Sequence, residues 1–361
     1  MNINLDDPQT YETLDPSDML GHLRRLPQQC QKAWQAGLDL ALPADYAGVN
    51  KVVISGMGGS AIGGELSRLL VEPTGTPLWV SRDYQPPPFL DSQTLFIASS
   101  YSGMTEETIS AFATALNTPA KKLVVTTGGK LRALAQEKNI PAFVYDYPAQ
   151  PRAALAYGFL SLLGIFQKLG LLGDISGDVA EMVSTMEKLA QCINEKVALP
   201  ANPAKELASK LVGRLVMVYG AGVLTPVARR WKTQLNENSK AWAFNETLPE
   251  LNHNAVAGYE FPQEMAGKAF AVLLRSPSLH QRILLRYQIT AEILARSGVS
   301  YQVIDAEGNQ PLSRMMSLVL LGDYVSYYLA LLYGVDPTPV KTIDYLRGCL
   351  KTSHEWLEKS H

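Results

Sequence analysis

The sequence predicts an α/β protein with two doubly wound parallel sheets, preceded and joined by helices. Three observations lead to this class: short β-branched runs alternate with helical stretches, the alternation restarts after a helical interruption, and a glycine turn follows the first strand of each series. The 361 residues suffice for two domains of ordinary size. We expect an N-terminal helical segment over 1–44, domains over 45–150 and 205–361, and a helical connector over 151–204.

The first half of the chain begins with helical periodicity and then alternates. Apolar residues at helical spacing predict one or two leading helices within 17–41. The strand-like runs that follow are "KVVIS", "PLWVSRD", "TLFIASSYSG", "KKLVVTTGG" and "PAFVYDY". Helical stretches such as "IGGELSRLLV" and "TEETISAFATAL" separate them, which predicts parallel pairing of the strands. Pro151 is placed to start a long helix over 151–170.

The second half repeats the α/β pattern. The run "RLVMVYGAG" (214–222) resembles the first strand with its glycine turn, and "AFAVLLRSP", "RILLRYQITAEILARSG" and "VSYQVID" continue the series. We expect two final helices over 312–334 and 338–358. The apolar stretch 315–335 is interrupted by Asp323 and several tyrosines, which favours a buried helix over a membrane span.

Composition excludes several classes of protein. The chain has 32 Lys and Arg against 34 Asp and Glu, so a basic surface for nucleic acid is not expected. Its three cysteines are far apart and form no CxxC pair, which argues against a disulfide scaffold or a zinc site. The first residues, "MNINLDDPQTYETLDP", are acidic and polar, unlike a signal peptide. We therefore expect a cytoplasmic protein.

The stretch "ISGMGGSAIGGEL" (54–66) follows an apolar strand and precedes a helix. Glycines in this position can leave backbone N–H groups free to hold a phosphate, here at Gly58 and Gly59, with the Ser60 hydroxyl as a further donor. The spacing also fits the dinucleotide fingerprint G-x-G-x-x-G/A. No GK[ST] follows, which argues against a P-loop ATPase.

A second strand end carries hydroxyl groups. In "ASSYSGMTEET", Ser100, Ser102 and Thr105 stand between a strand and a helix. The carboxyl ends of parallel strands lie along one edge of a sheet, so these side chains are expected near the first glycine turn. Together the two motifs predict a monophosphate site. Thr126 and Thr127 in "VVTTGGK" fit a phosphate site or a simple helix cap equally well.

The stretch "QLNENSKAWAFNETLPELNHNAVAGYE" (234–260) is dense in glutamate and asparagine. It also contains Trp242, Phe244 and Leu251, which predict burial. Buried polar groups need hydrogen-bond partners, so this density indicates a hydrogen-bonded site.

The motifs "GMGGSAIGGEL" and "SSYSGMTEET" resemble the phosphate-binding motifs of the sugar isomerase (SIS) domain. With "YPAQPRAALAY" and the 234–260 stretch, the chain resembles the bifunctional phosphoglucose/phosphomannose isomerase family over most of residues 45–350. This resemblance implies tandem, flavodoxin-like SIS domains, a phosphosugar substrate and an obligate homodimer. It also implies aldose–ketose isomerisation without a metal or other cofactor. Met104 departs from the family, where we expect asparagine.

The resemblance also implies roles for individual residues. Glu237 would carry the proton between C1 and C2, Arg152 would stabilise the enediolate, and His253, supplied across the dimer interface, would assist ring opening. Glu246, Glu250 and Glu260 are rivals of Glu237, and His253 could instead be a structural histidine. The family also uses a lysine on the C-terminal helix, for which Lys341 is a candidate; the alternative placement of the pattern puts the basic residue at Arg347, where arginine is a poor proton donor.

Two other functions remain open. A non-catalytic phosphosugar-binding regulatory module would share the same domains but would be expected to lack Glu237, His253 or Arg152. A nicotinamide-dependent dehydrogenase would use the glycine turn for its cofactor, with Asp83 as the acidic residue beyond the second strand. The dehydrogenase hypothesis leaves "SYSGMT" and the 234–260 stretch unexplained.

Overall fold

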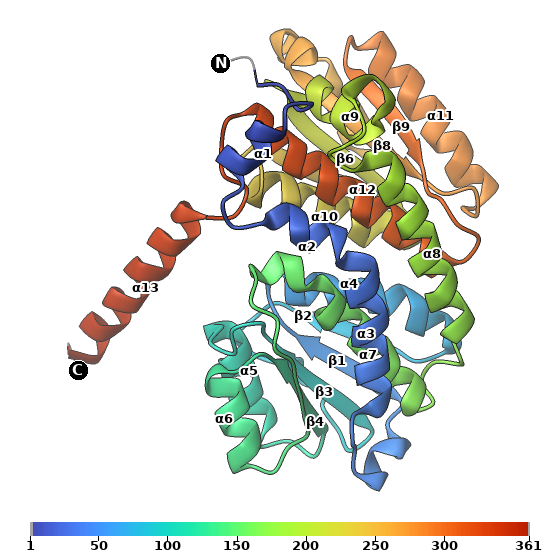
Figure 1. The fold of residues 1–361 in the computed structure, drawn as a ribbon. Helices are drawn as coiled ribbons and strands as arrows, with labels where there is room; N and C mark the ends of the chain where they lie inside the picture. The colour runs from blue at the N-terminus through green and yellow to red at the C-terminus, as the bar shows by residue number, and fades with distance from the viewer. Residues whose placement is uncertain (1–2, 360–361) are drawn as a thin grey trace.

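Two parallel sheets form the frame of the molecule (Figure 1). The computed structural model describes residues 3–359, with the side chains of residues 3–350. The first sheet has the order β2-β1-β3-β4-β5 and the second has the order β7-β6-β8-β9. Every pair of neighbouring strands is parallel. Both orders step outward from the first strand in two directions, the flavodoxin-like winding, which confirms the predicted fold class.

The strands of the first sheet are β1 (Lys51–Ser55), β2 (Leu78–Ser81), β3 (Thr94–Ser99), β4 (Lys121–Thr126) and β5 (Ala142–Val144). Those of the second sheet are β6 (Leu215–Ala221), β7 (Ala243–Leu248), β8 (Ala269–Arg275) and β9 (Ser300–Asp305). The helices of the first half are α1 (Pro8–Leu14), α2 (Met19–Arg24), α3 (Leu26–Asp39), α4 (Gly58–Val71), α5 (Glu106–Ala115), α6 (Gly129–Glu137) and α7 (Leu155–Lys168). Those of the second half are α8 (Ser176–Ile193), α9 (Pro203–Leu211), α10 (Thr225–Glu237), α11 (Gln281–Arg296), α12 (Pro311–Leu332) and α13 (Lys341–Lys359).

The central strands are mainly apolar in their middle positions because helices cover both of their faces. Side chains of a strand alternate between faces, so Val52 and Ile54 enter the core between the sheets while Val53 packs on the outer side with α5 and α6. The core between the sheets is continuous and includes the inner faces of both of them. The two halves are thus held together by a shared apolar layer of helices.

Helix α12 lies within that shared layer. By length and composition it could cross a membrane, but 94% of its most apolar window is buried inside the fold. This agrees with the prediction of a buried helix. The charge that interrupts its apolar run, Asp323, is itself only 2% exposed and is paired with Arg230.

Several elements differ from the sequence prediction. The segment that starts at Pro151 forms a 3₁₀ turn (Pro151–Ala154) before α7, and the last helix begins at Lys341 rather than at 338. Helices α1 and α10 and strand β7 were not predicted. The expected burial of the 234–260 stretch holds for Leu251 but is wrong for Trp242 and Phe244, which are 79% and 54% exposed.

The exposed aromatic residues have a topological cause. Strand β7 is one of the two edge strands of its sheet and has one strand neighbour, β6. Its sequence, AFNETL, has three consecutive polar residues, unlike the longer apolar runs of the central strands, and this weakens the strand signal. Helix α13 also extends away from the body of the molecule, with Tyr345 75% exposed (Figure 1).

Candidate active site

The first glycine turn lies at the carboxyl edge of the first sheet, between β1 and α4. Gly58, the first residue of α4, has a positive φ of 49°, which glycine adopts without strain. Gly59 lies against the 3₁₀ turn after β5, since a Cβ built on it would be 3.7 Å from the Cα of Arg152. Gly59 and Ser60 are half-buried, and Gly58 is exposed. The turn therefore places backbone N–H groups of a helix N-terminus beside Arg152.

The second hydroxyl-rich turn lies next to the first because β3 pairs with β1. The Ser100 Oγ is 2.7 Å from the Thr105 Oγ1, and the Gly103 N–H donates to Ser100 at 3.2 Å. The Met104 N–H donates to the Ser102 Oγ at 3.2 Å, and Ser102 is exposed. Met104 itself is 60% exposed. All the predicted phosphate-binding residues thus lie on two adjacent strand ends.

Gly103 fixes the shape of this second turn. Its φ is +64°, and a Cβ at this position would collide with the Gly128 carbonyl oxygen on the loop after β4. Thr126 and Thr127 also take part in the joint between the loops: Thr126 accepts from the Gly128 N–H, and the Thr127 hydroxyl donates to the Tyr101 carbonyl at 2.7 Å. The single proton of each hydroxyl is directed at a carbonyl, that of Thr126 at Gly128 at 3.0 Å and that of Thr127 at Tyr101, which favours the turn-forming interpretation over a phosphate contact.

Arg152 and Glu237 come together across the molecule, although they are 85 residues apart. The Arg152 Nη1 lies 3.4 Å from the Glu237 Oε2. The Arg152 side chain is 3% exposed, whereas that of Glu237 is 27% exposed and thus accessible to a ligand. Burial lowers the pKa of Arg152, and the negative charge of Glu237 opposes this effect.

The guanidinium of Arg152 is held by further hydrogen bonds. Its Nε donates to the Asn238 Oδ1 at 2.6 Å, and its Nη2 donates to the carbonyls of Pro337 and Thr338 at 2.7 and 2.8 Å. Arginine has five N–H donors, of which the contacts to Asn238, Glu237 and the two carbonyls use four. The remaining N–H is on Nη1, the nitrogen that faces Glu237. Among the residues whose side chains are described, no acceptor takes this last N–H, so one charged donor stays available beside the carboxylate.

A buried ion pair, Arg230–Asp323, contacts the main chain of Arg152. The Arg230 Nε and Nη2 contact the two carboxylate oxygens of Asp323 at 3.1 and 2.6 Å, and Arg230 also donates to the Arg152 carbonyl at 3.1 Å. Asn238 donates to the Ser326 Oγ at 3.0 Å. Sequence reasoning missed Arg230 and Asn238 as supporting residues. The isolated Asp323 within an apolar helix was the available signal, because a buried carboxylate needs a partner.

His253 lies at the opposite edge of the second sheet from Glu237. Glu237 ends α10, which leads to the start of β7, while His253 follows the end of β7 in the 3₁₀ turn Glu250–His253. The six residues of β7 separate the two edges by about 20 Å. His253 is exposed. Within one chain the structure therefore does not bring His253 to the Arg152–Glu237 pair.

Of the two basic candidates near the C-terminus, Lys341 lies closer to the pair along the chain. It is the first residue of α13, three positions after Thr338, whose carbonyl accepts from Arg152. Its side chain is exposed. Arg347 is farther along α13 and lies 3.8 Å from Asp344. The rival carboxylates Glu246, Glu250 and Glu260 lie on β7 or beyond its end, away from Arg152.

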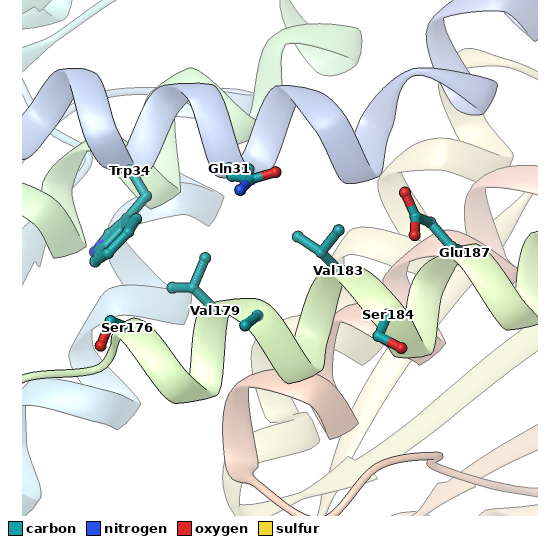
Figure 2. A pocket seen from close by; sticks show the side chains of 8 residues that line it. Gln31, Trp34, Ser176, Val179, Val183, Ser184 and Glu187 are labelled. Atoms are coloured by element: carbon teal, nitrogen blue, oxygen red, sulfur yellow. The ribbon is translucent and has the colours of Figure 1, made fainter.

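A cavity of about 240 Å³ between α3 and α8 lies apart from these groups. Figure 2 shows that its lining is mainly apolar near Trp34 and Val179 and becomes polar toward Ser184 and Glu187. None of the predicted site residues lines it.

Comparison with known proteins adds independent findings. Residues 200–350 match the family model described as the bacterial phospho-glucose isomerase C-terminal SIS domain. The chain is 42% identical over 334 residues to a bifunctional phosphoglucose/phosphomannose isomerase of Caldicellulosiruptor bescii, covering 92% of this chain and 98% of that protein. It is 37% identical to the protein of the same description from Aquifex aeolicus, over 83% of this chain and 90% of that one.

The fold has close neighbours among solved structures. A hypothetical protein from Thermus thermophilus superposes with a TM-score of 0.73 at 19% identity, covering 96% of this chain and 94% of that one. This likeness concerns the fold alone.

Proposed function

The chain belongs to the bifunctional phosphoglucose/phosphomannose isomerase family, and we propose that it interconverts glucose 6-phosphate and mannose 6-phosphate with fructose 6-phosphate through a cis-enediol(ate). The observation that carries this proposal is the buried Arg152 with one free N–H beside the accessible carboxylate of Glu237. Arg152 lies next to the first of the two hydroxyl-rich strand ends, at Gly59. The site combines an anion-binding edge with a base and a fixed positive charge.

In this proposal the domain over 45–150 binds the phosphate group. The N–H groups of Gly58 and Gly59 and the Ser60 hydroxyl form one side of the phosphate site. Ser100, Ser102 and Thr105 form the other side, on the neighbouring strand end. The donors are neutral, so they bind the phosphate by directed hydrogen bonds together with the dipole of α4.

Glu237 acts on the opened sugar. It removes the proton from C2 of the aldose, the C–H electron pair forms the C1=C2 double bond, and negative charge moves to O1. Arg152 stabilises that charge with its remaining N–H. A proton moves from O2 to O1, and Glu237 returns its proton to C1 while the C2 carbonyl forms. No electron leaves the sugar, so this sequence requires no redox cofactor and, in our proposal, no metal ion.

Ring opening requires another acid–base group, and we assign His253 of a second copy of the chain to it. His253 lies beyond the carboxyl end of β7, so it is far from Glu237 of the same chain. The same strand and its approach carry the exposed aromatic residues Trp242 and Phe244, and Phe261 farther along is 74% exposed. Such residues are enriched at protein interfaces. Lys341, at the root of α13, is a second candidate for ring opening. We place this homodimer in the cytoplasm.

The proposed function is tested by following fructose 6-phosphate formation from each sugar phosphate in the presence of a chelator and without nicotinamide. Conversion of both sugars is the expected result. Conversion of glucose 6-phosphate alone would retain the mechanism and narrow the substrate range. If neither sugar reacts but both bind, the chain is a regulatory phosphosugar-binding module. If neither binds, nicotinamide binding near Asp83 becomes the hypothesis to test.

The dimer is tested by mixing two inactive variants, Glu237→Gln and His253→Ala, after dissociation and reassociation. If each site combines Glu237 of one chain with His253 of the other, a mixed dimer contains one intact site. Random pairing then restores activity to about a quarter of that of the wild type, as expected for a two-fold symmetric dimer. A site built within one chain gives no recovery, because neither chain then has both residues.

A further inference from the structure

Lys240 stands out beside the Arg152–Glu237 pair because its ammonium is surrounded by main-chain carbonyls. Its Nζ lies 2.9 Å from the Glu237 carbonyl oxygen and 3.0 Å from that of Asn238, both at the end of α10. On the other side it lies 2.9 and 3.0 Å from the carbonyl oxygens of Asp336 and Pro337, in the segment that leads to α13. One side chain therefore joins two segments that are almost a hundred positions apart.

The backbone of Lys240 is in a conformation that lysine disfavours. Its φ is +55°, in the left-handed region that usually holds glycine at a helix end. A glycine would adopt this conformation without strain, but it would supply no ammonium. The presence of lysine at such a position points to a role for its side chain.

The contacts of Lys240 meet those of Arg152. Both side chains donate to the Pro337 carbonyl, Arg152 from Nη2 at 2.7 Å and Lys240 from Nζ at 3.0 Å. Without the ammonium, the carbonyls of residues 237, 238 and 336 would lose this donor, and the Pro337 carbonyl would keep only its hydrogen bond from Arg152. The segment that orients the Arg152 guanidinium is thus held in place by Lys240.

We propose that Lys240 is a positioning residue, whose ammonium clamps residues 336–337 to the end of α10 and thereby fixes Arg152 and Glu237 relative to each other. This inference rests on the proposed function for its catalytic consequence, but the clamp itself does not depend on the substrate. Lys240 contacts carbonyls rather than a sugar, so its removal is expected to lower kcat more than it raises KM.

The clamp is expected to open at alkaline pH. Lys240 as a whole is exposed, but partial desolvation of its ammonium, together with the charge of Arg152, lowers its pKa to about 8, while Asp336 and Glu237 oppose this effect. As the pH rises through about 8, the ammonium becomes an amine and loses one N–H and its charge. The pKa is below its unfolded value, so this deprotonation does not weaken the fold. The wild type should therefore lose kcat above pH 8 while it stays folded.

Three variants separate the side chain from the backbone. Lys240→Met removes the charge and keeps the strained backbone, Lys240→Gly removes both, and Lys240→Arg keeps a charge that does not titrate in this range. We expect kcat to fall at least about tenfold in the Met and Gly variants, with KM within about twofold, since one fixed charge next to the reacting groups is removed. Lys240→Arg should retain activity up to a higher pH than the wild type. Lys232→Met on α10 is the matched control for loss of a lysine.

A measurement without substrate separates this inference from the proposed function. Hydrogen–deuterium exchange of a peptide spanning 336–345 should be faster in Lys240→Met than in the wild type and the Lys232→Met control. If Lys240→Gly keeps the wild-type kcat and exchange, Lys240 is only a helix cap and the inference is wrong. If the Met variant does not fold, the pH profile and the exchange rates of Lys240→Arg decide. If kcat of Lys240→Arg falls above pH 8 as it does in the wild type, the proposed role of the ammonium is wrong.

Discussion

The two sheets share one winding order, yet their carboxyl edges carry different chemistry. In the first, the glycine turn 56–60 ends in a serine at a helix N-terminus and lies beside the hydroxyls of the next strand end. In the second, the turn after β6 continues into Val223 and Leu224, and a Cβ on Gly222 would be 3.0 Å from the Leu279 side chain. In our proposal, a strand end serves as a ligand site only where its side chains leave hydrogen-bond donors free.

In our proposal, the second domain contributes Glu237 to the site from the amino-terminal edge of its sheet. At its carboxyl edge the Arg275 guanidinium is paired with Asp305 through two contacts of 2.7 and 2.8 Å, so its charge is already satisfied. The carboxylate of this half that pairs with Arg152 of the first half is Glu237, at the end of α10. Repetition of an α/β unit thus does not repeat its function.

The largest effect is expected from Glu237→Gln. Loss of the proton carrier should lower kcat on the order of a thousandfold, as general base removal commonly does. Glutamine is similar in shape, so the Kd for a sugar phosphate, measured by calorimetry, should stay close to that of the wild type. Glu246→Gln on β7 is the control and should remain active. If Glu237→Gln retained turnover, the base would be another residue. The proposed difference between the edges of the two sheets would then be wrong.

A smaller effect is expected from Arg152→Lys. Lysine lacks the planar donor fork and cannot contact Asn238, Pro337 and Thr338 together. We expect kcat to fall about a hundredfold and the free energy of unfolding to fall by about 2 kcal/mol, because buried acceptors lose their donors. Steady-state kinetics and denaturant unfolding measure the two effects. Arg229→Lys, at a side chain 46% exposed, should change neither.

The smallest effects are expected from single hydroxyl deletions at the glycine turns. Ser60→Ala and Ser102→Ala should each raise KM about tenfold with little change in kcat, the loss expected for one hydrogen bond to a charged group. Thr225→Ala, after the second glycine turn, should leave KM unchanged. If Thr225→Ala weakens substrate binding as much as Ser60→Ala does, the two edges do not differ as described.

Sequence reasoning succeeded where the signal was local. The strands of the first sheet, the helices after them and the two glycine- and serine-rich turns were all predicted from neighbouring residues. It failed at β7, whose exposed edge leaves it without the continuous apolar pattern of a covered strand. It also misjudged Trp242 and Phe244, because an aromatic residue on an edge strand has no layer above it within the chain.

Periodicity and turn chemistry act between near neighbours, so the α/β class, the parallel winding and the residue types at each strand end can be predicted from the sequence. Which of these residues meet depends on the packing of elements that are far apart in the chain. Arg152 reaches Glu237 because α7, α10 and α12 pack in one core, with the Arg230–Asp323 pair behind them. His253 is kept away by the length of β7. Contacts between residues far apart in the chain depend on how whole elements pack, which no local pattern encodes.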